Sequence, residues 1–328
     1  MRHLHVLLNK YKIAIYTLFI FSMIGIVAML YRDIRYFFLF FGIGLLDSTS
    51  RILVVRYPKL LQFFRLTLLV LIGSSLFAGI CLIIGVNFQF IEIFFDLSAW
   101  VVTGALIQLI VARLILPFFA GNAFCSRACW NGAFFEFTNP MKKKTNPKKR
   151  SPLLAWGYLL FLVVLGFTVA FLSPVNPAEN QEVRMWWIIG ENILIIFVGF
   201  FLSISWGSRA YCRTLCPFIT ISSLIAPYSL LKITPVAADQ CTSCNACNKA
   251  CPMYIDVLQA VKDRKRVNDS MCILCERCVS SCKLNVLKVA TKMPKPHYDK
   301  ETKLSSKRIA FSYLNLSNDE ANAANKLL

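Results

Sequence analysis

The sequence C-T-S-C-N-A-C-N-K-A-C at residues 241–251 is followed, at residues 272–282, by C-I-L-C-E-R-C-V-S-S-C. Both stretches space their cysteines as C-x₂-C-x₂-C-x₃-C. Three cysteines in a tight loop can wrap one side of a metal cluster, whereas the fourth ligand has to come from a distant segment. The doubled spacing therefore predicts two metal clusters whose ligands lock the two stretches into one small domain.

This spacing is typical of bacterial ferredoxins with two [4Fe–4S] clusters, in which the fourth cysteine of each run binds the cluster of the other run. It predicts two ligand sets. The first set is Cys241, Cys244, Cys247 and Cys282. The second set is Cys272, Cys275, Cys278 and Cys251. We expect an α+β ferredoxin domain over residues 233–292.

Two other uses of eight cysteines fit this spacing less well. Zinc also takes four thiolates, but zinc ribbons usually present isolated C-x₂-C pairs instead of a doubled run of four. A disulfide framework is unexpected if the segment is cytoplasmic, as the charge pattern below indicates, because thiols there are kept reduced.

The composition places most of the chain in a membrane. Of the 328 residues, 57% are hydrophobic, and the mean hydropathy is +0.58, well above the values of soluble domains. The formal net charge is +19, which in a soluble protein would suggest nucleic acid. In a membrane protein, lysine and arginine gather in cytoplasmic loops, so no nucleic-acid partner is predicted.

Six apolar stretches are candidates for membrane-spanning helices, because about 20 apolar residues cross a bilayer. They cover residues 13–30, 34–55, 66–86, 98–120, 153–172 and 185–206. The second is the weakest, because its continuous apolar part is too short to span and is interrupted by polar residues from Asp47 to Arg51. We interpret it as a tilted span or a re-entrant piece. Together the stretches predict an α-helical bundle over residues 1–232.

The charges of the loops predict an orientation. The loop at residues 141–150 carries six basic residues and should be cytoplasmic, whereas the loop at residues 173–184 has Glu179 and Glu182 and should lie outside. With six spans, both termini and the ferredoxin domain face the cytoplasm. We therefore expect a multi-pass protein of the bacterial cytoplasmic (inner) membrane, with residues 293–328 as a polar C-terminal tail.

A second cysteine pattern occurs twice at the cytoplasmic ends of predicted spans. An aromatic residue precedes C-x₃-C in both places, and the four cysteines are Cys125, Cys129, Cys212 and Cys216. Each follows the second helix of a predicted hairpin, which indicates a two-hairpin repeat about an axis normal to the membrane. Cysteines at i and i+4 share a helical face, so the two pairs are predicted to converge.

Three interpretations of these four cysteines remain open. They form a third metal or iron–sulfur site at the membrane surface. Alternatively, they are redox-active thiols whose pKa is lowered by Arg127 and Arg213. The remaining interpretation is that they are free cysteines buried for packing.

Several common cofactor sites are not predicted. The histidines are His3, His5 and His297, none within a predicted span, and no C-x-x-C-H occurs, so no haem is expected. No glycine-rich phosphate-binding motif is present, so no nicotinamide is expected. Glu191 lies within the sixth predicted span, where a carboxylate is a candidate proton acceptor for a bound quinol. The alternative is a hydrated residue near the start of that helix; Asp47 has a weaker claim of the same kind.

Taken together, predicted spans, two C-x₃-C motifs and the C-terminal cysteine runs resemble the NapH/MauN-type membrane polyferredoxins. The resemblance covers roughly residues 98–290. It implies two [4Fe–4S] clusters and quinone or quinol as a substrate. Two positions depart from the family pattern, since Trp130 and Lys283 stand where proline usually follows the cysteine. Neither is a ligand, so the clusters are not in doubt.

The resemblance implies a membrane-bound electron-transfer protein between the quinone pool and a redox partner. That partner would be a soluble ferredoxin or a periplasmic or membrane oxidoreductase, and the chain would be a quinol dehydrogenase component. Two alternatives remain: an accessory protein that reduces a metal or disulfide for another complex, and a structural anchor for a soluble ferredoxin or reductase.

Overall fold

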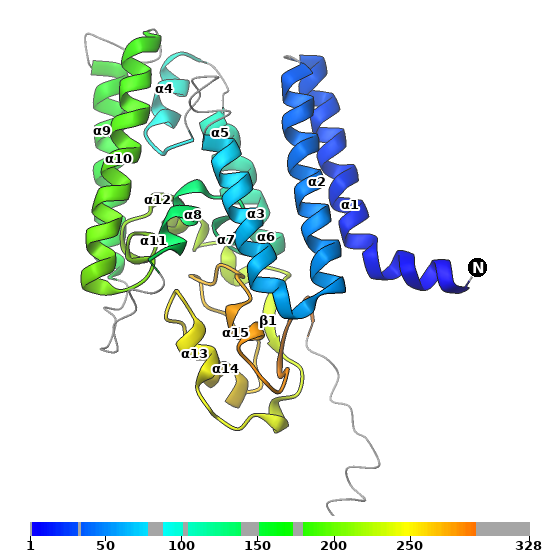
Figure 1. Ribbon diagram of the computed structural model, residues 1–328. Coiled ribbons are helices and arrows are strands. Elements are labelled where there is room, and N and C mark those ends of the chain that lie inside the picture. The colour runs from blue at the N-terminus through cyan, green and yellow to red at the C-terminus, as the bar shows by residue number, and fades with distance from the viewer. Residues whose placement is uncertain are drawn as a thin grey trace, which may run out of the picture. The chain divides into compact units, whose positions relative to one another are not determined.

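The computed structural model describes residues 2–31, 34–77, 88–100, 104–138, 151–172 and 180–292. The expected tail, Cys81, the basic loop at residues 141–150 and Glu179 lie outside these residues. Met1–Lys292 form one compact unit, which is mostly helical in the described part (Figure 1).

The first two helices form a hairpin. Helix α1 (Arg2–Tyr31) and helix α2 (Ile34–Arg56) lie side by side (Figure 1). The stretch at residues 34–55 was expected to be interrupted, but α2 is continuous through it. Its polar residues are satisfied: Arg51 Nε donates to Asp47 Oδ2 at 2.6 Å, and Ser48 Oγ donates to the Ala14 carbonyl at 2.7 Å. An ion pair one turn apart lets a helix carry both charges through an apolar segment.

Among the described residues, three helical stretches are long and apolar enough to cross a membrane by length and composition: Phe37–Val54, Pro152–Leu172 and Glu182–Trp206. Three others are apolar but shorter, namely Ala14–Val27, Leu61–Ser75 and Ala105–Ala120. Six spans are therefore not confirmed. The segment that the sequence made weakest is one of the three that qualify, because its polar residues pair within the hairpin instead of ending the helix.

The long helices are bounded by clear local signals. Helix α10 (Gln181–Trp206) starts at Asn180, whose Oδ1 accepts from the backbone N–H of Glu182 at 3.0 Å, and it ends at Gly207 with φ 88°. Helix α9 (Pro152–Phe167) starts after the N-cap Ser151 and continues as a π-helical turn, Thr168–Leu172. Asparagine and serine are preferred N-caps, and glycine readily takes a positive φ at a C-terminus.

The remaining bundle elements are shorter. They are a 3₁₀ turn (Pro58–Leu60), α3 (Leu61–Ser75), α4 (Glu92–Ser98), α5 (Gly104–Gln108), a π-helical segment (Leu109–Ile115), α6 (Leu116–Ala120), α7 (Phe124–Arg127), α8 (Trp130–Glu136), α11 (Ala210–Thr214), α12 (Pro217–Ser222) and a 3₁₀ turn (Ala226–Tyr228). Helix α3 packs on α7 and α8, and α9 packs on α11 and α12. The C-x₃-C segments thus lie between longer helices.

The C-terminal segment has an α+β arrangement. Strand β1 (Lys232–Pro235) pairs antiparallel with β2 (Leu287–Ala290), so that Lys232 faces Ala290 and Pro235 faces Leu287. Between the strands lie a 3₁₀ turn and three short helices: Ala238–Gln240, α13 (Ala246–Ala250), α14 (Val257–Lys262) and α15 (Arg277–Ser280). Because the strands bracket both cysteine runs, their pairing closes the segment around the cysteines.

Candidate functional site

The two C-x₃-C pairs come together at one small cavity. Cys125, Cys129, Cys212 and Cys216 all line it, and its volume is about 30 Å³. Cys125 and Cys212 are buried, while Cys129 and Cys216 are half-buried. The prediction that the pairs converge is therefore met by the geometry. What they hold is a separate question.

Both pairs are positioned by the same sequence of local turns. Helices α6 and α10 end at Gly121 and Gly207, both with positive φ. A short helix then carries the first cysteine of each pair, and the second cysteine directly precedes the next short helix, α8 or α12. Gly132 lets α8 lie close to the backbone of Cys125, because a Cβ at Gly132 would lie 2.5 Å from the Cys125 carbonyl oxygen.

A buried arginine reaches the thiols from the π-helical segment. Arg113 Nη1 donates to Cys125 Sγ at 3.0 Å, and its guanidinium lies between the rings of Phe124 and Phe218, at 4.7 and 4.9 Å from their centroids. Arg113 Nε and the side-chain oxygens of Gln108 and Asn131 line the same cavity without a hydrogen-bond partner in the described structure. Unpartnered buried polar groups are rare in proteins. A polar group bound in this cavity would give them partners.

A charge network surrounds the cavity on the side of α8. Glu136 Oε1 accepts from Arg65 Nη2 at 2.6 Å, and Glu136 Oε2 accepts from Arg209 Nη2 at 2.5 Å. Arg209 also donates to the carbonyl oxygens of Cys125 and Gly132, at 3.1 and 3.0 Å. Burial alone would raise the pKa of Glu136, but three arginines hold it well below its usual range. The carboxylate is therefore charged, and it fixes the backbone around the first cysteine pair.

The thiols themselves are in a strongly desolvated place. Burial raises the pKa of Cys129 and Cys212, and it raises the pKa of Cys216 to about 12. As free thiols, Cys129, Cys212 and Cys216 would therefore be protonated at neutral pH, whereas a bound metal would reverse that preference by deprotonating its ligands. In the described part of the chain, no three His, Cys, Asp or Glu side chains already stand in the arrangement of a single-ion site.

The arginines predicted to activate the thiols are largely engaged elsewhere. Arg127 pairs with Glu276 at 2.6 Å. Arg213 stacks over the Tyr254 ring at 4.6 Å and donates to the Trp206 carbonyl oxygen at 2.6 Å. Sequence reasoning chose these two because they adjoin the cysteines in the chain. It missed Arg113 and Arg209, which reach the cavity by folding.

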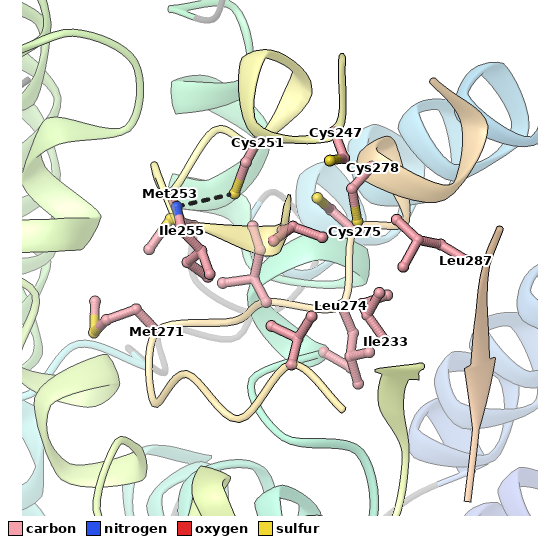
Figure 2. Close-up of a cluster of buried hydrophobic side chains, with 14 of the residues drawn as sticks. Ile233, Cys247, Cys251, Met253, Ile255, Met271, Leu274, Cys275, Cys278 and Leu287 are labelled. Carbon is pink, nitrogen blue, oxygen red and sulfur yellow. Dashed lines mark hydrogen bonds between the residues drawn. The ribbon is translucent and has the colours of Figure 1, made fainter. Parts of the chain in front are cut away.

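Seven of the eight ferredoxin cysteines, all but Cys244, interact electrostatically with other cysteines of the two runs. Cys247 interacts electrostatically with Cys241 and Cys282, and Cys272 with Cys275 and Cys251. Cys278 interacts with Cys275, Cys272 and Cys251, and also with Cys247 of the other set. In Figure 2 the side chains of Cys247, Cys275 and Cys278 lie close together, and the Ile255 N–H donates to Cys251 Sγ at 3.4 Å.

The loops around these cysteines fit [4Fe–4S] clusters. Three pairs of equivalent positions in the two runs have positive φ: Ser243 and Leu274, Asn245 and Glu276, and Tyr254 and Asn285. Non-glycine residues pay about 1–2 kcal/mol for this conformation, which persists only where the surroundings impose it. Loops curled in this way turn backbone N–H groups toward a common centre and favour a negatively charged group there. The donors and the loops both fit a thiolate-held cluster.

A second, larger cavity adjoins the first. Its volume is about 570 Å³, and most of its lining is apolar. Its polar residues include Gln89, Tyr158, Glu191 and Tyr211. Tyr158 and Tyr211 are hydrogen-bonded to each other, and both interact electrostatically with Glu191. Glu191 is half-buried on α10. Asp47, the other candidate carboxylate, pairs with Arg51 on α2 and does not line this cavity.

Two family models match the chain. One, described as a 4Fe-4S dicluster domain, matches residues 235–283, which contain both cysteine runs. The other, described as a 4Fe-4S binding domain, matches twice, at residues 102–148 and 189–233. Each of these two segments contains one C-x₃-C pair. No solved structure matches the chain.

The relatives of the chain include ferredoxin-type proteins. An uncharacterized protein of Methanocaldococcus jannaschii is 29% identical over 56% of this chain and 78% of its own length. The ferredoxin-type protein NapH of Haemophilus influenzae is 26% identical over 57% of this chain and 69% of its own. The methylamine utilization ferredoxin-type protein MauN of Paracoccus denitrificans is 24% identical over 55% of this chain and 66% of its own length. The predicted resemblance to the NapH/MauN-type polyferredoxins is confirmed: the chain is similar to ferredoxin-type proteins named NapH and MauN, and both family models that match it describe 4Fe-4S domains.

Proposed function

We propose that the protein relays electrons between the quinone pool and a redox partner, and that it oxidises quinol as a quinol dehydrogenase component. The main observation behind this proposal is that the large apolar cavity shares a wall with the four-cysteine cavity. Gln89, Tyr211 and Pro217 line both. A ligand in the large cavity would therefore lie directly beside the buried thiols.

The large cavity has the properties of a quinone site. Its volume falls in the range of roughly 300–1,000 Å³ that is usual for small-molecule sites, which are mostly apolar with a few placed polar groups. Trp186, Trp187 and Phe161 provide flat apolar walls for a ring. Tyr158, Tyr211 and Glu191 provide hydroxyl and carboxyl groups for the quinol oxygens.

Glu191 in this cavity can take up one of the two protons of the reaction, and the second proton is released to solvent. Oxidation of one quinol to quinone releases two electrons and two protons. Glu191 is placed to accept a proton, and the Tyr158–Tyr211 hydrogen bond orients the two hydroxyl groups next to it. A carboxylate within a membrane segment is a functional candidate because it is costly to keep there. The electrons pass toward the neighbouring cysteine-rich parts of the chain.

Twelve cysteines are proposed as cluster ligands. One [4Fe–4S] cluster would be held by Cys241, Cys244, Cys247 and Cys282, and another by Cys272, Cys275, Cys278 and Cys251. The four C-x₃-C cysteines would hold a further iron–sulfur or metal site, which their buried cavity and its unpartnered polar groups support. Such groups supply one-electron transfer.

The placement in the cell follows from the charges. We propose a multi-pass protein of the bacterial cytoplasmic membrane with the ferredoxin segment and both termini in the cytoplasm. The shorter apolar helices would complete the six spans, and the paired C-x₃-C segments would be the ends of two repeated hairpins. The partner would be a soluble ferredoxin or a membrane or periplasmic oxidoreductase.

A filled cavity tests this function. Gly190 lines the large cavity, and a Cβ added there meets no heavy atom within 4 Å. Gly190→Phe should therefore place a ring in the cavity without displacing the backbone. Full-length protein in nanodiscs is mixed anaerobically with a quinol analogue, and the bleaching of iron–sulfur absorbance is followed. We expect bleaching in the wild type and its loss in the variant.

The matched control is Gly157→Phe. Gly157 also has open space around its Cβ, but it lies on α9 and does not line the cavity. The iron–sulfur absorbance of Gly157→Phe should bleach like that of the wild type. Wild-type protein that is not bleached by quinol, although dithionite reduces it, would overturn direct quinol oxidation.

A further inference from the structure

The hydrogen bonds and ion pairs between the ferredoxin segment and the bundle gather on one of the two cysteine runs. Gln62 Nε2 donates to the Cys275 carbonyl oxygen at 3.1 Å, and Asn122 Nδ2 donates to the Ser270 carbonyl oxygen at 2.8 Å. Arg127 on α7 pairs with Glu276 at 2.6 Å. All three contacts fall on the loop that carries Cys272 and Cys275. The second run therefore rests on the bundle.

The fourth ligand proposed for this set approaches the bundle as well. Cys251 is followed by Pro252 and Tyr254, which touch the turn after α10. Ser208 Oγ donates to the Pro252 carbonyl oxygen at 3.4 Å, and Arg213 stacks on Tyr254. A Cβ at Gly207 would lie 2.3 Å from the Tyr254 hydroxyl oxygen, so this turn has no room for a side chain. The ligands of one set thus lie in segments that contact the bundle: Cys251, Cys272 and Cys275 in loops, and Cys278 on α15, which packs on α3.

Glu136 links this set to the four-cysteine cavity. It accepts hydrogen bonds from Arg65 and Arg209, which contact the backbone of the C-x₃-C segment, and from Arg277. Arg277 lies between Cys275 and Cys278 in the chain. Arg209 also interacts electrostatically with both Cys212 and Cys275. One buried carboxylate therefore ties the cavity to the second run.

The other set has one ligand that faces water, Cys244, whereas Cys247 is buried and Cys241 and Cys282 are half-buried. Cys244 is exposed, and so are its neighbours Thr242, Ser243 and Asn245. At the equivalent positions of the second run, Ile273, Leu274 and Cys275 are buried and Glu276 is half-buried. The two runs share one spacing but differ in their surroundings, because one packs on the bundle.

We propose that Glu136 is a positioning residue that seats the Cys272–Cys278 loop on the four-cysteine cavity. The set of Cys272, Cys275, Cys278 and Cys251 is then the inner one, next to the bundle. The set of Cys241, Cys244, Cys247 and Cys282 is the outer one, from which a soluble partner exchanges electrons. This order rests on the ligand sets of the proposed function, but it does not depend on quinol being the substrate.

Iron release to a charged chelator tests the order. Full-length protein in nanodiscs is treated anaerobically with bathophenanthroline disulfonate, and the coloured iron complex is followed with time. We expect a fast phase from the outer set and a slow phase from buried iron. Cys244→Ser should remove the fast phase and keep the slow one. Release in a single phase, or a fast phase that survives in Cys244→Ser, would overturn the order.

Two variants test Glu136. Glu136→Gln should accelerate the slow phase several-fold and leave the fast phase unchanged. Glu136→Gln leaves three arginines around a neutral side chain. Arg277→Gln is therefore a milder second variant, because it keeps Glu136 paired with Arg65 and Arg209. It should have the same effect. The control is Asp239→Asn, which removes an exposed carboxylate–arginine pair in the ferredoxin segment.

The outcomes separate the two proposals. A slow phase in Arg277→Gln that matches that of Asp239→Asn would overturn the seating role. Wild-type protein without about eight ferredoxin irons would instead overturn the proposed ligand sets. Loss of quinol bleaching alone would leave the order intact.

Discussion

The ferredoxin segment and the four-cysteine cavity are both cysteine sites, but they are assembled in different ways. In the ferredoxin segment, eight cysteines lie within residues 241–282, and positive φ values recur at equivalent places in both runs. In the cavity, four cysteines come from two separate parts of the chain and meet through Arg113, Arg209 and Glu136. Local spacing builds the first site, whereas long-range ion pairs build the second.

This difference predicts which substitutions each site tolerates. A site built by local spacing should fail when a ligand is removed and should be indifferent to surface charges. A site built by long-range ion pairs should fail when a charged residue that never touches the bound group is removed. Five changes, in order of decreasing effect and with the first two as a matched pair, test the comparison.

The largest effect is expected from removal of a ferredoxin ligand. Cys275→Ser should lower the ferredoxin iron from about eight to about four per chain, because a [4Fe–4S] cluster needs four thiolates. Iron and acid-labile sulfide are counted on the purified full-length protein.

The change matched to Cys275→Ser replaces four cysteines with serine, namely Cys125, Cys129, Cys212 and Cys216. It should leave about eight irons and remove any excess over eight that the wild type carries. Wild type with no excess would argue against a cluster in the cavity. An equal loss of ferredoxin iron in both variants would erase the contrast between the two sites.

Glu136→Ala should destabilise the bundle strongly. The Glu136 side chain is 2% exposed and neutralises three arginines. Breaking a buried ion pair by removal of one partner typically costs ~3–5 kcal/mol, because a charge is left uncompensated. Denaturant unfolding in detergent micelles measures the free energy of unfolding. A loss no greater than that of Asp239→Ala would show that the cavity does not depend on this network.

A second long-range charge cluster predicts a pH dependence. Glu92 and Asp96 are buried, and both pair with Arg184. Burial raises the pKa of Glu92 from 4.5 to about 7, and Arg184 only partly opposes it. The folded state then holds a proton that the unfolded state releases, so stability should fall as pH rises from about 4.5 to 7. At about 1.4 kcal/mol per pKa unit, the contribution is ~3 kcal/mol.

The test for Glu92 is the slope of stability with pH. The free energy of unfolding of wild type and Glu92→Gln is measured at several pH values in this window. The variant should have a flatter slope. Parallel slopes would mean that the Arg184 pairs, which favour the charged carboxylate, outweigh burial.

The smallest effect is expected in the ferredoxin segment. Asp239 and Arg264 form an ion pair with side chains 77% and 69% exposed. Exposed pairs contribute ~0–1 kcal/mol, so Asp239→Asn should leave both stability and iron content close to those of the wild type. A thermal melt with iron counting measures this. A marked loss of iron would show that surface charge helps to hold the ferredoxin loops.

The ligands of the ferredoxin segment could be predicted from the sequence, whereas the charged residues around the four-cysteine cavity could not. The spacing of the eight cysteines predicts two ligand sets, and most interactions between these cysteines fall within a set, although Cys278 also interacts with Cys247 of the other set. The assignment of Arg127 and Arg213 to the thiols was guided by adjacency in the chain, which says little about which arginine folds onto them. Three of the six predicted spans coincide with helices long and apolar enough to cross a membrane. Residues 34–55 were expected to be interrupted, but they form a continuous helix in which Asp47 pairs with Arg51.

The sequence by itself determined the donors and their spacing, because ligand loops and helix ends are set by residues a few positions apart. It determined the membrane character too, since long apolar stretches need no partner to be recognised. Only the tertiary structure decided that Glu136 joins Arg65, Arg209 and Arg277, and that the large cavity borders the four cysteines. These features depend on which distant side chains share a buried, weakly screened space, where a charge has to find its partner.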